Sequence, residues 1–116
     1  MERRLAAIFA ADVVGYSHLM SKDEEGTLAA LKKSRATADP IIATHHGRIF
    51  GSAGDSLVAE FSSPVEAVRC AMEIQSSLKQ INAGLPDEKR MLLRIGINLG
   101  DIKVDGEITT KFISQP

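Results

Sequence analysis

The pattern of apolar and polar positions predicts strands near both ends of the chain. The run from Leu5 to Ala11 contains no polar residue, which is typical of a central strand, and this run ends at Asp12. Residues 93–99 instead alternate between apolar and other side chains, as a strand with one buried face does. The second strand should therefore turn one set of residues away from the core, namely Arg94, Gly96 and Asn98.

Two other stretches carry apolar residues at helical intervals. Ser21 precedes Glu24 at the spacing of a capping box, which predicts a helix from there to His46-Gly47, kinked or broken at Pro40. Ser63-Pro64 is a second helix start. The second helix should pack on a sheet through residues that step by four and three: Ala67, Ala71, Ile74, Leu78 and Ile81.

The remaining segments complete a fold prediction. Residues 48–50 and 56–61 flank the glycine-rich tip 51–55, which predicts a β-hairpin. Gly100-Asp101 and Asp105-Gly106 predict turns on either side of a short strand over 102–104. The order strand, helix, strand, strand, helix, strand is the split βαβ arrangement of a ferredoxin-like α+β domain, with helices on one face of an antiparallel sheet. The other face carries few charges, which favours a dimer.

Composition narrows the class of protein. The 116 residues are 44% apolar and carry a net charge of −1, which fits one globular domain without bulk attraction to nucleic acid or anionic membranes. A single cysteine excludes an internal disulfide and fits a reducing compartment. The first apolar run is short for a signal peptide, and no stretch approaches the ~20 apolar residues of a membrane span. We therefore expect a cytoplasmic chain with no nucleic-acid partner and no direct membrane contact.

Two acidic residues far apart in sequence are candidates for a metal site. Asp12 ends the first strand and Asp55 lies at the hairpin tip, and these two places are neighbours in a split βαβ sheet. Two carboxylates brought together repel each other unless a cation lies between them, and hard oxygen ligands suit Mg²⁺ or Mn²⁺. Composition and spacing alone still favour the simpler interpretation, in which both residues only shape turns.

Further candidates surround this pair. Val13 to Ser17 leads from the strand toward a helix and could present backbone N–H groups to an anion, although such a segment is more often a plain connection. Arg94, in an otherwise apolar strand, needs a counter-charge or an exit to water. His45-His46 at a helix end complements the helix dipole better than it forms a metal site. The positions of Cys70 and the histidines assemble no nucleophilic triad.

Three separately spaced motifs resemble the class III adenylate/guanylate cyclase catalytic domain. They are Phe9 to Ser17, Gly54-Asp55-Ser56 and Arg94 to Gly100, and the resemblance runs from about Arg4 to Gly106. It implies a ferredoxin-like core that acts as a head-to-tail dimer, with the nucleotide bound between two chains. The partner would be a second copy or a cyclase homologue.

The resemblance also implies roles for single residues. Asp12 and Asp55 would be catalytic and would hold two Mg²⁺ or Mn²⁺ ions with the Val13 carbonyl. The phosphates of ATP or another purine nucleoside triphosphate would contact Gly15, Tyr16, Ser17 and Arg94. The implied reaction joins the ribose 3′-oxygen to the α-phosphate and gives cyclic AMP and pyrophosphate, which is a phosphorus-oxygen lyase activity in cyclic-nucleotide signalling.

The sequence departs from the family pattern in two places. Gly51 stands where the family has a base-reading lysine or glutamate, which leaves the choice between ATP and GTP open. Residues 107–116 contain neither Asn nor Arg, whereas the family continues with transition-state residues of both types. We expect a homology domain over 1–106 with a divergent tail over 107–116, and weak or no activity of the isolated chain. The alternatives are a non-catalytic dimerisation or regulatory module and a truncated gene product.

Overall fold

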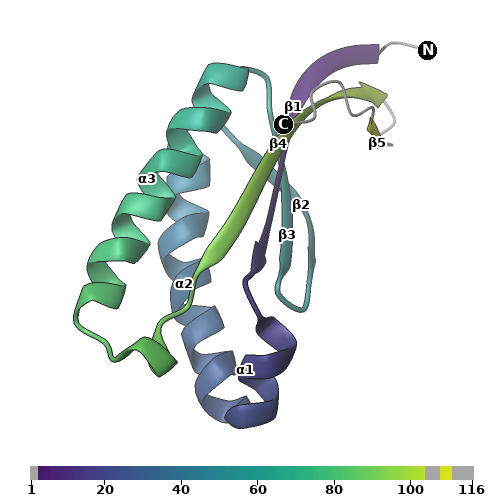
Figure 1. The fold of residues 1–116 in the computed structure, drawn as a ribbon. Helices are drawn as coiled ribbons and strands as arrows, with labels where there is room; N and C mark the ends of the chain where they lie inside the picture. The colour runs from purple at the N-terminus through teal and green to yellow at the C-terminus, as the bar shows by residue number, and fades with distance from the viewer. Residues whose placement is uncertain (1–2, 104–107, 111–116) are drawn as a thin grey trace.

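The fold is an antiparallel sheet with two long helices on one face (Figure 1). The computed structural model describes residues 3–103 and 108–110. The sheet order is β2-β3-β1-β4-β5, and all neighbouring strands are antiparallel. The elements in chain order are β1 (Arg3–Val13), α1 (Tyr16–Lys22), α2 (Glu24–Thr44), β2 (Arg48–Ala53), β3 (Ser56–Phe61), α3 (Pro64–Ala83), the 3₁₀ turn η1 (Asp87–Lys89), β4 (Leu93–Lys103) and β5 (Ile108–Thr110). This arrangement confirms the ferredoxin-like α+β prediction and adds the strand β5.

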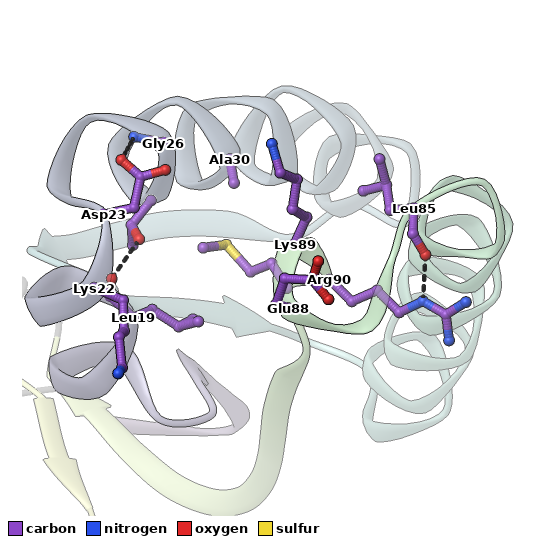
Figure 2. Close-up of a pocket in the computed structure, with 11 residues that line it drawn as sticks. Leu19, Lys22, Asp23, Gly26, Ala30, Leu85, Glu88, Lys89 and Arg90 are labelled. Atoms are coloured by element: carbon purple, nitrogen blue, oxygen red, sulfur yellow. Dashed lines mark hydrogen bonds between the residues drawn. The ribbon is translucent and has the colours of Figure 1, made fainter.

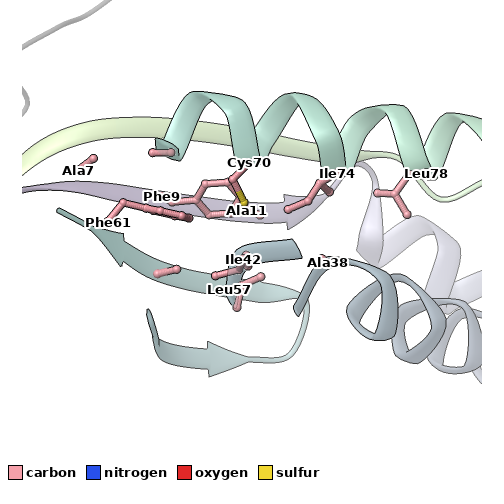
Figure 3. Packing of buried hydrophobic residues seen from close by; sticks show 12 residues of the cluster. Ala7, Phe9, Ala11, Ala38, Ile42, Leu57, Phe61, Cys70, Ile74 and Leu78 are labelled. Atoms are coloured by element: carbon pink, nitrogen blue, oxygen red, sulfur yellow. The ribbon is translucent and has the colours of Figure 1, made fainter. Parts of the chain in front are cut away.

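Alternation along the strands sends one set of side chains into the core beneath the helices. Phe9 of β1 and Phe61 of β3 are fully buried there, with ring centroids 5.7 Å apart. Ile42 from α2 and Ile74 from α3 pack into the same cluster, which also includes Cys70 (Figure 3). Both long helices are therefore fixed to the sheet through one continuous apolar core.

The opposite set of side chains lies on the sheet face away from α2 and α3, which we call the open face. Ala6 and Ile8 of β1 form a small buried cluster there with Phe50 and Val58. Arg94 follows the same alternation, because it pairs with Asp12 across β1 and β4. The predicted outward direction of the polar positions in β4 is thus confirmed.

The start of α2 differs from the prediction, whereas the start of α3 agrees with it. The expected capping box at Ser21 is wrong, because Ser21 lies inside α1 and donates its hydroxyl to the His18 carbonyl at 2.7 Å. Asp23 caps α2 instead, accepting the Gly26 N–H at 3.0 Å. The prediction for α3 is confirmed, since Ser63 accepts the Glu66 N–H and Pro64 begins the helix.

The expected break at Pro40 does not occur. A single helix α2 continues through Pro40 to Thr44. Ala38 and Ile42, on either side of the proline, are both 1% exposed, so burial of the helix face outweighs the missing backbone donor.

The end of the sheet also corrects the prediction. Gly100-Asp101 is not a turn, because β4 runs straight through it to Lys103, paired with β1 along its whole length. Asp105-Gly106 lies outside the described residues. Among the described helices, none combines the length and the apolar composition that a membrane crossing requires.

Candidate functional site

The hairpin between β2 and β3 carries Asp55 to the end of β1. Gly54 and Asp55 form a two-residue turn, with Gly54 at φ 56°, where glycine is favoured. The Asp55 Oδ2 atom accepts the backbone N–H of Val13 at 3.0 Å, across 42 positions of sequence. The tip of the hairpin is thereby attached to the residue that follows Asp12.

Asp12 and Arg94 face each other on neighbouring strands of the open face. Arg94 donates its Nε–H to Asp12 Oδ1 at 3.0 Å and an Nη–H to Oδ2 at 3.2 Å, a two-pronged ion pair. The hydrogen bond and charge of Asp12, helped by the charge of Asp55, raise the pKa of Arg94. The expected counter-charge of Arg94 is therefore Asp12, while the Asp12 side chain remains 40% exposed to solvent.

A shallow hollow of about 300 Å³ adjoins this ion pair on the open face. Gly96 contributes to the open space, because a Cβ placed on it would meet nothing within 4 Å. Its lining takes in residues of three strands: Ala10, Ala11, Asp12, Ser56, Leu57, Val58, Arg94, Ile95 and Gly96. The hollow gives a ligand access to Asp12 and Arg94 from solvent.

The connection after β1 begins the helix α1 without a side-chain cap. Gly15 is the N-cap residue at φ 67°, and a Cβ there would meet open space. Tyr16 and Ser17 form the first turn, where backbone N–H groups have no partner within the helix. Only Val13 and Val14 separate Gly15 from Asp12, so this segment lies close to the Asp12 carboxylate in the chain.

The donor set fits a small divalent cation. Asp12 and Asp55 offer hard carboxylate oxygens, and the Val13 carbonyl belongs to the same segment. Within residues 3–103 and 108–110, no cluster of three His, Cys, Asp or Glu side chains has metal-binding geometry. Protein ligands would thus be few, as is usual for Mg²⁺, which keeps several water molecules.

Gly51 lies in β2 opposite Val58 and therefore on the open face. A Cβ at Gly51 would approach Val58 only to 3.7 Å, which is ordinary contact. The fold consequently leaves room for a Cβ at this position, so packing does not require a glycine there.

Glu60 was missed by the sequence analysis. It lies on the open face away from Asp12, 5% exposed, with ion pairs to Arg4 at 3.2 Å and to Arg48. The one available signal was a charged residue inside the apolar strand 57–61, which needs a partner when it is buried.

His45 has a role that its position only partly indicated. It is the C-cap residue of α2, as the helix-end interpretation predicted. Its Nδ1 contacts Glu66 at 2.8 Å and its Nε2 contacts Glu73 at 2.9 Å, both on α3. Sequence spacing could not indicate this bridge, because the contact depends on how α2 packs against α3.

A second hollow, of about 230 Å³, lies apart from these residues (Figure 2). It is enclosed by α1, the first half of α2 and the segment before β4. Leu19, Ala30 and Met91 line it, together with charged side chains such as Lys22 and Lys89. None of the predicted site residues lines this hollow.

Comparisons with known proteins identify the family and the fold of the chain. No family model matches the chain. Putative adenylate cyclase 3 of Rhizobium meliloti (strain 1021) is 44% identical over 106 residues, which are 90% of this chain and 18% of that protein. The crystal structure of an adenylate/guanylate cyclase/hydrolase from Silicibacter pomeroyi has a TM-score of 0.84 at 44% identity. The chain belongs to the class III adenylate/guanylate cyclase family.

The chain spans only part of the length of the proteins it matches, 18% of the Rhizobium protein and 65% of the Silicibacter chain. The cyclase domain described here aligns over 95% of its own length with 65% of the Silicibacter chain. The structure of a bacterial light-regulated adenylyl cyclase matches the fold with a TM-score of 0.80 at 21% identity, over 89% of this chain and 57% of that one. The predicted family resemblance is confirmed, whereas the roles of individual site residues stay predictions.

Proposed function

We propose that this cyclase domain binds a purine nucleoside triphosphate with two Mg²⁺ or Mn²⁺ ions, and that Asp12 and Asp55 hold the ions. The hydrogen bond from Val13 to Asp55 carries the proposal, because it brings the hairpin carboxylate to the residue next to Asp12. The Val13 carbonyl would complete the protein ligands. Family membership supports ATP as the substrate and cyclic AMP with pyrophosphate as the products.

In this proposal, some residues of the site bind the metal ions and others bind the phosphates. When bound, the two ions would activate the ribose 3′-oxygen and offset charge on the phosphates. Gly15, Tyr16 and Ser17 would donate backbone N–H groups to phosphate oxygens, and Arg94 would bind the triphosphate through its guanidinium. The 3′-hydroxyl would give its proton to solvent water as its oxygen bonds to the α-phosphorus, while the bond from that phosphorus to the bridging oxygen breaks and pyrophosphate leaves.

The open face is the surface through which we propose that the domain pairs with a second copy or a cyclase homologue. This face combines the small apolar cluster around Ile8 with the Asp12 site. Gly51 offers no group to a base, so any base preference would come from other positions. We propose that residues 1–106 form the homology domain, that it acts in the cytoplasm, and that the isolated chain has weak or no activity.

Calorimetric titration with Mn²⁺ tests the metal site directly. We expect Asp12→Asn and Asp55→Asn each to weaken Mn²⁺ binding by about 10–100-fold or more, since each removes an ionic ligand. Asp87→Asn is the matched control, because Asp87 is an exposed carboxylate that pairs with Arg90. Equal Mn²⁺ affinity in all four proteins, or no binding to the wild type, would contradict the proposal.

Cyclic-nucleotide formation from Mn²⁺-ATP is measured next, alone and with a full-length homologue. If this chain contributes to catalysis, we expect cyclic nucleotide to form with the wild type and not with Asp12→Asn. The second candidate, a non-catalytic dimerisation module, is favoured by Gly51. It predicts a complex with the homologue in analytical ultracentrifugation that yields no additional product.

A further inference from the structure

The side chains of Asp12 and Arg94 are paired through two hydrogen bonds in this structure. Both oxygens of Asp12 accept hydrogen bonds from Arg94, at 3.0 and 3.2 Å. These are the same oxygens that the proposed function assigns to a divalent cation. A guanidinium and a divalent cation would repel each other if both contacted the one carboxylate.

The charges around the pair point in the same direction. Asp55 is held by the Val13 N–H, and its negative charge also acts on Arg94. Asp12, Asp55 and Arg94 together carry one net negative charge. Adding a divalent cation while Arg94 moves away neutralises the two carboxylates and leaves one positive charge on the arginine, which is then available to an anion.

Separating Arg94 from Asp12 requires little free energy. Its side chain is 71% exposed, and the neighbouring Gly96 leaves open space beside it. An exposed ion pair contributes little to stability, so its loss is readily offset by metal binding.

We propose that Arg94 is an exchangeable internal counter-ion, which holds Asp12 until a divalent cation displaces it and then turns to the phosphate that accompanies the cation. This inference rests on the proposed function. Metal and triphosphate binding would be coupled through one side chain, and by linkage each would strengthen the other.

Binding of Mn²⁺ alone, without nucleotide, gives the first test. In Arg94→Gln the competitor is absent, so we expect Mn²⁺ to bind about two- to fivefold more tightly than to the wild type, the range that an exposed ion pair can supply. In the wild type, saturating Mn²⁺ should raise the affinity for ATP. This increase should be absent in Arg94→Gln.

The side-chain Nε–H signals of arginine in nitrogen-15 NMR spectra give the second test. The Arg94 signal, assigned by its absence in Arg94→Gln, should shift and exchange faster with water when diamagnetic Mg²⁺ saturates the protein. Arg35 is the matched control, since its Nε–H donates to Asp39 at 2.8 Å outside the site. Its signal should not move.

The outcomes separate the two proposals. Wild-type Mn²⁺ binding that depends on Asp12 but is no tighter in Arg94→Gln, or an Arg94 signal unmoved by Mg²⁺, overturns the exchange and leaves the metal site standing. No Asp12-dependent binding in either protein overturns both.

Discussion

The two carboxylates of the open face that pair with arginine differ in how far solvent reaches them. Glu60 is 5% exposed between Arg4 and Arg48, whereas the Asp12 side chain is 40% exposed. A buried carboxylate that loses its cations is strongly penalised, while a half-exposed one can exchange them. The same chemical group is therefore structural at Glu60 and available for binding at Asp12.

Burial also determines the behaviour of the single cysteine. Cys70 is fully buried in the core, and desolvation, followed by the charges of Glu73 and Glu66, raises its pKa to about 11. The reactive thiolate is then about one part in a thousand at pH 8. We expect Cys70 to react with a thiol reagent far more slowly in the native protein than in urea.

The control for this prediction is a cysteine on the exposed side of the same helix. Ser76→Cys should react rapidly in the native state, because position 76 is exposed. Equal rates at Cys70 and at the new position would show that the core opens readily.

At the level of single residues, the sequence identified the candidates but not all of their partners. Asp12 was singled out at the end of an apolar strand, Asp55 at a hairpin tip, and Arg94 inside an otherwise apolar strand. That Arg94 pairs with Asp12 depends on the register of β1 against β4, which no local pattern specifies. Glu60 and the partners of His45 were missed for the same reason, since their contacts join residues up to 56 and 28 positions apart.

Helices α2 and α3 are joined at one end by His45. Carboxylates accept hydrogen bonds only, so His45 keeps both its contacts, to Glu66 and Glu73, only when both ring nitrogens carry protons. The hydrogen bonds to Glu73 and then to Glu66 raise the pKa of His45 above 6.5. The hydrogen bond from His45 in turn lowers the pKa of Glu66.

These pKa shifts make the stabilisation by the contacts of His45 with Glu66 and Glu73 depend on pH in a definite direction. The His45 contribution to the free energy of unfolding is complete below pH 6.5 and is lost as pH rises through the raised pKa. The Glu66 contribution is lost as pH falls through its lowered pKa. In urea unfolding at pH 6 and pH 9, we expect wild type to lose more stability on going to pH 9 than His45→Gln does.

His18→Gln is the control for His45→Gln, because His18 is an exposed histidine in α1. It should retain the wild-type pH dependence. A wild-type profile in His45→Gln would mean that the bridge contributes nothing measurable.

Local signals were sufficient for α3 and misleading for α2 and β4. Ser63-Pro64 combines a cap and a favoured first residue, and α3 begins there. At Pro40 and at Gly100-Asp101, tertiary burial and strand pairing outweigh residues that usually end an element. Asp23, not Ser21, caps α2. Serine and aspartate are both good N-cap residues, so the sequence alone could not distinguish the two positions.

For the whole molecule, stability depends on the core beneath the helices. Phe61 is fully buried against Phe9 in the cluster that holds α2 and α3 to the sheet. We expect Phe61→Ala to lower the free energy of unfolding by about 3–5 kcal/mol, a large part of the total for a domain of this size. Urea unfolding followed by far-ultraviolet circular dichroism measures it, since the chain has no tryptophan.

Phe50→Ala serves as the matched substitution on the open face, where Phe50 is only partly buried. Its loss of stability should be clearly smaller. Similar losses for the two variants would contradict the assignment of the main core to the helix side of the sheet.

The attachment of Asp55 to Val13 has an evolutionary consequence. The donor is a main-chain amide, which every amino acid except proline supplies, so side-chain replacement at position 13 leaves this anchor intact. Because Val13 is itself buried, descendants of this chain can exchange it for other apolar side chains that fit the core without displacing the hairpin acid, and proline is the substitution that selection should exclude.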